Sequence, residues 1–133
     1  MGFKAFEVEH DISFHDALLR SISTDLVEQR AEFVVDLCVG NPNASTEAER
    51  ERRRGARLVL TGVQYLVIEP PDPKYRYQLG APVDIDSCEA DPAMSVLSSG
   101  REQVLAGRFF GSDWNSFIHF AATSAVLTWL ERA

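Results

Sequence analysis

The sequence predicts a mostly β protein, either an antiparallel β-sandwich or a partly open barrel, with at most one or two short helices. Segments in which apolar and polar residues alternate recur along the chain, and turn-forming residues separate them at intervals of about 8–12 residues. Strands do not alternate with helix-length segments, as they would in a parallel α/β fold. The 133 residues, 45% of them hydrophobic, indicate a single folded domain over residues 1–133, because domains typically contain about 100–150 residues.

Residues 18–39 carry the clearest strand pattern. Apolar and polar residues alternate up to Leu26, and the alternation resumes over residues 31–39, after a polar turn at 28–30. In the second run, four apolar side chains share one face: Phe33, Val35, Leu37 and Val39. The pattern predicts a β-hairpin whose second strand directs this face into the core.

Three further segments have the composition of strands. Residues 57–69 are rich in β-branched and aromatic residues, and Gly62 in their middle predicts a β-bulge. Three prolines end that segment, and the alternation over 75–79 and 83–86 predicts two shorter strands. The charged residues 47–54 fit either a helical turn or a solvated loop, and a single helical turn is expected over 93–97, ended by residues 98–100.

The C-terminal third contains a turn signal, Gly111-Ser112-Asp113, between two apolar runs, which predicts a second hairpin. Residues 116–131 fit either a helix or strands. Their Val, Thr, Trp and Phe content favours a strand to about Thr123, followed by a second strand or a terminal extension.

Charge and composition narrow the classes of function. Asp and Glu number 20 against 13 Lys and Arg, giving a net charge of −7, so a protein that binds nucleic acid is not expected. The N-terminus is not a signal peptide, because it turns acidic within seven residues, and the chain lacks the ~20 apolar residues of a membrane span. These features predict a cytoplasmic protein without a membrane partner, in which Cys38 and Cys88 are free thiols.

The segment His10-Asp11-Ile12-Ser13-Phe14-His15-Asp16 is the densest group of ionisable residues. Neutral imidazole is the commonest nitrogen ligand of metals in proteins, so a metal site built from His10, His15, Asp16 and the distant His119 is one hypothesis. The structural alternative is that Asp11 or Ser13 caps a turn and that His15 and Asp16 bond to neighbouring backbone groups. A third interpretation assigns His10, Asp11, His15 and Asp16 to a binding surface.

A second acidic group comprises Asp84, Asp86, Glu89 and Asp91, with Cys88 among them. On a strand, Asp84, Asp86 and Cys88 share one face. The group is either a binding surface or a solvated edge that discourages pairing with other strands. The chain also contains none of the common nucleophile, phosphate-loop or zinc-protease motifs, so no catalytic residue and no cofactor are predicted.

The tetrapeptide Phe14-His15-Asp16-Ala17, followed by the hairpin, resembles the opening of the immunity protein 50-like family of small bacterial proteins that neutralise polymorphic toxins. Residues 58–66, LVLTGVQYL, also resemble the strand after the first loop of such proteins, and together the similarity covers about half of the chain. The resemblance implies a cytoplasmic inhibitor that binds a toxin domain and has no catalysis of its own.

Two functions of different classes remain. The favoured one is a small acidic binding module, of the toxin-neutralising kind, that docks on a basic protein partner, since negative potential speeds association with basic surfaces. The alternative is a metal-dependent hydrolase that uses the His/Asp group near the N-terminus. The oligomeric state is left open.

Overall fold

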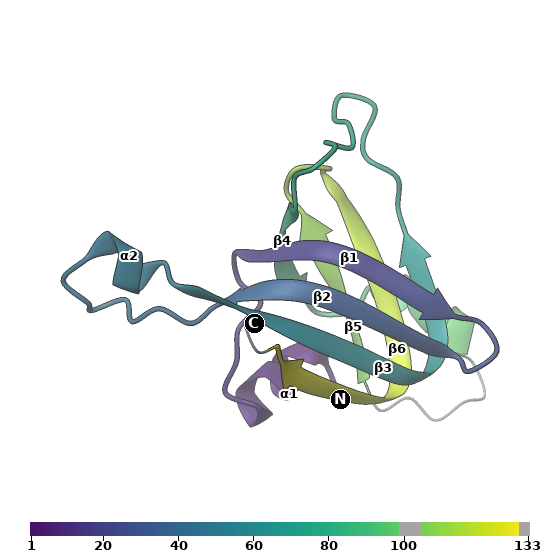
Figure 1. The fold of residues 1–133 in the computed structure, drawn as a ribbon. Helices are drawn as coiled ribbons and strands as arrows, with labels where there is room; N and C mark the ends of the chain where they lie inside the picture. The colour runs from purple at the N-terminus through teal and green to yellow at the C-terminus, as the bar shows by residue number, and fades with distance from the viewer. Residues whose placement is uncertain (99–104, 131–133) are drawn as a thin grey trace.

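The alternating segments form the strands of an antiparallel barrel in the computed structural model, which describes residues 1–98 and 105–130 (Figure 1). The strands are β1 (Ala17–Asp25), β2 (Arg30–Cys38), β3 (Arg53–Ile68), β4 (Val83–Cys88), β5 (Leu105–Gly111) and β6 (Ser116–Trp129). They pair in the order β1-β2-β3-β6-β5-β4, and β1 closes the barrel on β4. The prediction of a mostly β antiparallel fold is confirmed, and the barrel is closed rather than partly open.

Three short helices accompany the barrel: α1 (Phe3–Glu9), α2 (Glu47–Arg50) and the 3-10 helix η1 (Pro92–Ser98). The helical alternative within 47–54 and the helical turn expected over 93–97 correspond to α2 and η1, although Ser99 and Gly100, expected to end the latter, lie outside the described residues. None of the helices in the described ranges is both long enough and apolar enough to cross a membrane.

The hairpin predicted over residues 18–39 is β1 and β2. Phe33, Val35 and Leu37 are buried as expected. Leu26 was expected in the first strand, but it lies in the turn, 86% exposed. The strand stops at Asp25 because the Asp25 carboxylate accepts bonds from the backbone N–H groups of Val27 and Glu28, which stabilises a turn there.

The bulge predicted in the middle of β3 is present, but it lies at Gln64, two residues after the predicted Gly62. Gly62 has a φ of +62°, and the register of β3 against β6 shifts between Val63 and Tyr65. Glycine favours this left-handed conformation, and a Cβ atom at Gly62 would lie 3.0 Å from the Cβ of Thr123 on β6, so the position has no room for a side chain.

Residues 116–129 form one continuous strand, which excludes the helical alternative and the expected break near Thr123. The strand expected over 75–79 is not formed, and this prediction was wrong. The segment belongs to a projecting loop in which the Tyr77 ring packs on Trp114, with centroids 5.2 Å apart. Closure of the barrel by β1 and β4 leaves no strand edge there for residues 75–79 to join.

The core is built from aromatic rings to which α1 contributes two. Phe3 and Phe6, one helical turn apart, are buried against Phe14, Phe109 and Phe120. The helix approaches β5 at Gly107, where a Cβ atom would lie 2.6 Å from the Cβ of Phe3. The missing side chain of Gly107 therefore lets α1 lie directly against the barrel.

Candidate functional site

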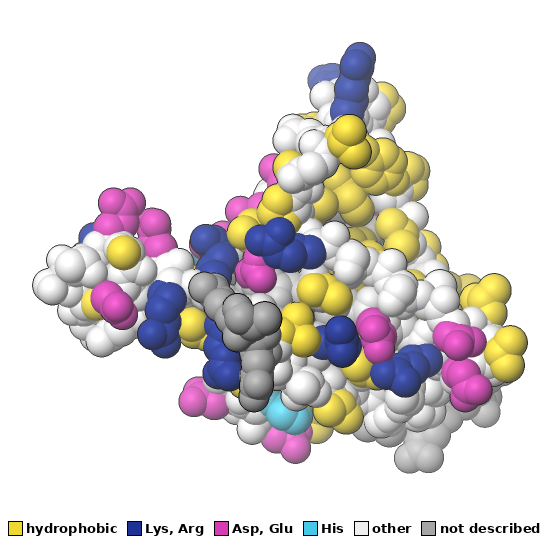
Figure 2. All heavy atoms as spheres, in the orientation of Figure 1, with side chains coloured by type: hydrophobic (Ala, Val, Ile, Leu, Met, Phe, Trp, Pro, Cys, Tyr) yellow, Lys and Arg dark blue, Asp and Glu magenta, His cyan; other side chains and the backbone are white. Residues whose placement is uncertain are grey.

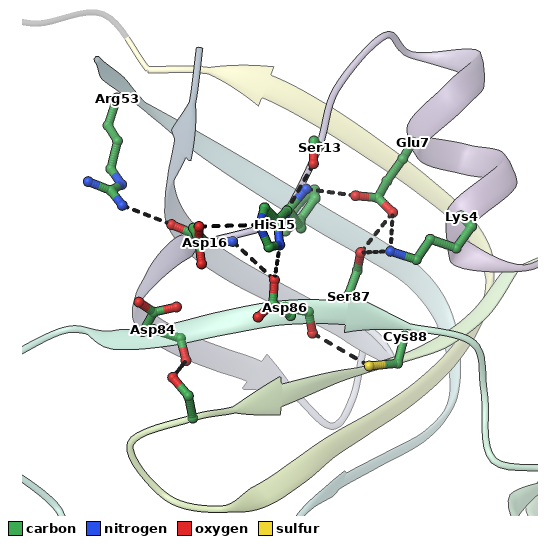
Figure 3. Close-up of polar contacts among 12 residues, drawn as sticks. Lys4, Glu7, Ser13, His15, Asp16, Arg53, Asp84, Asp86, Ser87 and Cys88 are labelled. Carbon is green, nitrogen blue, oxygen red and sulfur yellow. Dashed lines mark hydrogen bonds and ion pairs between the residues drawn. The ribbon is translucent and has the colours of Figure 1, made fainter. Parts of the chain in front are cut away.

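Barrel closure brings together the two acidic segments that lie about seventy residues apart in the sequence. Ala17 pairs with Ile85 and Leu18 with Asp84, so the residues just before β1 lie beside β4 (Figure 3). His15 Nδ1 is 2.5 Å from Asp86 Oδ1, and His15 Nε2 is 3.3 Å from Asp16 Oδ2. The backbone N–H of Asp16 also donates to Asp86 Oδ1, at 3.2 Å.

The outer side of β4 carries the rest of this group. Ile85 and Ser87 are buried, whereas the alternate residues Asp84, Asp86 and Cys88 are half-buried on the opposite side, as the sequence predicts. Asp113, from the turn between β5 and β6, accepts a bond from the backbone N–H of Asp84 at 2.9 Å. We call His15, Asp16, Asp84, Asp86 and Asp113 the acidic face.

The pKa of Asp84 reflects the charges that surround it on the acidic face. Burial raises the pKa of its carboxyl, and the negative charges of Asp16, Asp86 and Asp113 raise it further. The positive charge of Arg53 opposes this rise without cancelling it, so the pKa stays above its ordinary value. The acidic face thus gathers four carboxylates around one histidine, His15, with the charge of Arg53 nearby.

The neighbouring surface has a different arrangement of charge. Figure 2 shows basic and acidic side chains interspersed over the outer side of β1 to β3. Arg20 pairs with Asp36 there, and Arg30 and Arg57 both pair with Glu32. Charge is therefore paired one to one or nearly so on this surface, whereas on the acidic face four carboxylates share one histidine.

Asp84→Asn is expected to stabilise the protein by about 0.5 kcal/mol at neutral pH, because it removes a half-buried charge and its repulsion by neighbouring carboxylates. A raised folded-state pKa means that the folded protein holds the Asp84 proton more tightly than the unfolded chain. Stability is therefore lost as the pH rises through that pKa, and the gain from the substitution should vanish below the ordinary value of 3.8. Urea denaturation across this pH range measures the effect. Asp36→Asn, which breaks the bond to Arg20 Nε, should destabilise instead, and equal effects of the two substitutions would contradict this account.

A buried carboxylate lies behind the acidic face. Glu7 is 6% exposed, and its Oε2 accepts from the backbone N–H of Phe14 at 2.6 Å. Its Oε1 accepts from Ser87 Oγ at 2.8 Å and lies 3.7 Å from Lys4 Nζ (Figure 3). Glu7 therefore joins α1 to both segments that form the acidic face. The sequence analysis missed it, although Phe3, Phe6 and Glu7 fall on one face once residues 3–9 are assigned as a helix.

The structure does not bring the four residues of the metal hypothesis together. Within the described ranges, the His, Cys, Asp and Glu side chains with ligand atoms within 4.8 Å of one another are His15, Asp16 and Asp86. His10 ends α1, with Nδ1 3.0 Å from the carbonyl oxygen of Phe6. His119 lies on β6, 2% exposed, with Nε2 2.6 Å from Glu69 Oε2.

The remaining candidates are distributed over separate places. Asp11 occupies an exposed left-handed turn after α1, with a φ of 51°. Glu89 and Asp91 lie beyond the end of β4, where Arg108 bonds to the Glu89 carbonyl oxygen at 3.0 Å and approaches the Asp91 carboxylate at 3.8 Å. Ser13 accepts the backbone N–H of His15 at 3.1 Å, which is the turn expected from the structural alternative. The His15 ring, however, contacts the carboxylates of Asp16 and Asp86 rather than the backbone groups expected there.

The contact between Glu69 and His119 predicts a pH effect. Burial raises the pKa of Glu69, but bonds from His119 and from the backbone N–H of Phe117, with the charges of His119 and Arg108, lower it below the ordinary 4.5. A lowered folded-state pKa contributes stability above pH 4.5 that is lost as the pH falls through the folded value. In Glu69→Gln the free energy of unfolding, measured by urea denaturation, should therefore fall less steeply than in the unaltered chain as the pH is lowered from about 5 to 3. Glu28→Gln, in the exposed β1–β2 turn, is the matched control and should leave the curve unchanged.

Comparison of the chain with family models, with curated proteins and with solved structures finds no match in any of the three. The function is therefore inferred from the chemistry of the acidic face and its surroundings.

Proposed function

We propose that this protein is a non-enzymatic binding module whose acidic face docks on a basic surface of a protein partner. The observation that carries the proposal is the convergence of four aspartates from three separate segments on one side of the barrel. Burial and, after it, the charges of its neighbours raise the pKa of Asp84, and a docked basic surface would offset the repulsion among these carboxylates.

Long-range electrostatics support the same function. The chain carries a net charge of −7, and a cluster of one sign within a like-signed protein steers an oppositely charged partner toward it. Such steering raises the association rate more than it raises the affinity. The proposed partner is therefore a protein with a basic surface.

The finer form of the proposal is a cytoplasmic, toxin-neutralising role of the immunity type. It rests on the resemblance carried by Phe14-His15-Asp16-Ala17. Within this tetrapeptide Phe14 and Ala17 are fully buried, whereas His15 and Asp16 are exposed on the acidic face. The motif thus supplies two core anchors and two surface groups, an arrangement suited to presenting a binding residue on a rigid barrel.

Affinity capture from the native host, with products of neighbouring genes included, tests the proposal. Three baits are compared: the unaltered chain, the acidic-face variant D16N/D84N/D86N, and the charge-matched control E9Q/E28Q/E51Q, whose three positions are exposed. Asn at position 16 tolerates the positive φ of 55° found there.

We expect a basic protein to be retained by the unaltered chain and by the control but not by the acidic-face variant. Addition of about 0.5 M salt should release it, because exposed charges are screened beyond a few ångströms at that ionic strength. Equal retention on all three baits, or no retained protein on the unaltered chain, would count against the proposal. A toxin-like gene product as the captured protein would support the finer form.

A second function, metal-dependent hydrolysis, is favoured by the grouping of His15, Asp16 and Asp86. One imidazole and two carboxylates form a donor set that suits several divalent transition metals. Metal analysis of untagged protein and thermal unfolding with added zinc or manganese test it, with D86N as the comparison. Less than about a tenth of an equivalent of bound metal, with no thermal shift, would exclude this function.

A further inference from the structure

A cavity of about 520 Å³ lies beside the acidic face, between the segment that leaves α1 and the ends of β2 and β6. Its apolar wall is formed by Ile12, Leu37, Val39 and Trp129. Glu7 and Asp11 supply carboxylates, and no Lys or Arg is among the described residues that line it. Cavities of about 300–1,000 Å³ with apolar walls and a few polar groups are typical of binding sites.

The carboxylates of the cavity differ in what they offer a ligand. Both oxygens of Glu7 already accept bonds, from Phe14 and Ser87. Asp11 is exposed, and within the described ranges its carboxylate forms no hydrogen bond or ion pair. Glu7 also lies 3.7 Å from Lys4 Nζ, which offsets its charge. A cationic group entering along the apolar wall would therefore pair with Asp11.

Trp129 indicates which cation suits the wall. The guanidinium carbon of Arg54 lies 4.6 Å from the centroid of the Trp129 ring, so this indole already stacks with one guanidinium of the chain. Arg54 is not among the residues that line the cavity, whereas Trp129 is, so a ligand would use the part of the ring that faces the cavity. Guanidinium groups stack on aromatic rings and are more weakly hydrated than ammonium groups. The aromatic ring suits the flat guanidinium, the carboxylate of Asp11 suits its positive charge, and the aliphatic wall suits the methylene groups of an arginine side chain.

We propose that this cavity takes an arginine side chain of the protein partner, next to the surface that docks on the acidic face. This inference rests on the proposed function, and it identifies one residue type, arginine, by which the partner would be held. Residues 11–16 link the two regions, because Ser13 borders the cavity and accepts the backbone N–H of His15. Buried arginines are frequent anchors at the centres of protein interfaces.

The test uses the full chain and the peptide acetyl-Gly-Arg-Gly-amide, with the citrulline peptide as its neutral isostere. Binding is followed at constant ionic strength by backbone amide NMR signals and by the indole N–H signal of Trp129. We expect saturable shifts at Ile12, Val39 and Trp129, with a Kd in the millimolar range, and binding of the citrulline peptide at least about tenfold weaker.

Two variants with the same change of charge locate the site. Asp11→Asn should weaken binding of the arginine peptide about fivefold, whereas Glu9→Gln, exposed at the end of α1, should leave it unchanged. Alkylation supplies a second readout, because Cys38 lines the cavity and Cys88 does not. The arginine peptide should slow modification of Cys38 at least about threefold and leave that of Cys88 unchanged.

The outcomes separate this inference from the proposed function. Shifts confined to His15, Asp84 and Asp86 would overturn the cavity as the arginine site and leave docking on the acidic face intact. Equal binding of the arginine and citrulline peptides, or no saturable shift, would also overturn it. If the capture experiment fails but the arginine peptide still causes specific shifts at Trp129, the cavity binds arginine and the proposed docking by the acidic face is wrong.

Discussion

Replacement of Phe109 by alanine is expected to lower the free energy of unfolding by about 3–5 kcal/mol. The Phe109 ring is fully buried and contacts four other buried rings: Phe3, Phe14, Phe33 and Phe120. Its removal leaves a cavity where α1, β2, β5 and β6 meet, which these rigid rings cannot refill. Urea denaturation followed by circular dichroism measures the loss.

The neighbouring Phe110 is the matched control for Phe109. It points away from the core and packs against Phe117, with ring centroids 5.1 Å apart. Phe110→Ala should cost about 1 kcal/mol. Where Phe109→Ala does not fold, Phe109→Leu should cost about 1–2 kcal/mol. Equal costs at positions 109 and 110 would contradict the described core.

Removal of the Glu7 carboxylate is expected to cost about 3 kcal/mol of stability in Glu7→Ala, because the backbone N–H of Phe14 and the hydroxyl of Ser87 lose their buried acceptor. Glu7→Gln keeps one acceptor oxygen and should cost less. Thermal and urea unfolding measure both variants. Glu9→Ala, exposed on the same helix, should change stability by less than about 0.5 kcal/mol. A Glu7→Ala variant as stable as Glu9→Ala would show that this carboxylate does not tie α1 to the barrel.

The strands were predictable because burial on one side imposes alternation on the sequence. Phe33, Val35 and Leu37 alternate for this reason, and Gly62 indicated a bulge two residues from its actual place in β3. Alternation alone does not reveal whether a neighbouring strand exists. Residues 75–79 alternate as β4 does, yet they remain a loop because closure leaves them no partner.

Helix α1 was missed for a related reason. Seven residues are too few for a helix to be stable by itself, and its pattern of Phe3, Phe6 and Glu7 acquires meaning only against the barrel. Tertiary packing, and above all the space left by Gly107, determines this element.

The candidate site was predictable in its parts but not in its assembly. Both acidic segments were chosen from the sequence, whereas their contact depends on the register of β1 with β4, a pairing between distant segments. The same long-range geometry separates His10 and His119 from His15. Closeness in the sequence therefore suggested a four-residue metal site that the structure does not assemble. It also gave no sign that Asp113 belongs to the acidic face, because Asp113 meets Asp84 only through the fold.

The most direct test of docking by the acidic face is the association rate of the captured partner as a function of ionic strength. For the unaltered chain and for the control E9Q/E28Q/E51Q, we predict a rate constant that falls at least about tenfold between low and high salt. For the variant D16N/D84N/D86N, we predict a slow rate that hardly depends on salt. Identical salt dependence in the two triple variants would contradict the account, because steering would then come from net charge rather than from this face.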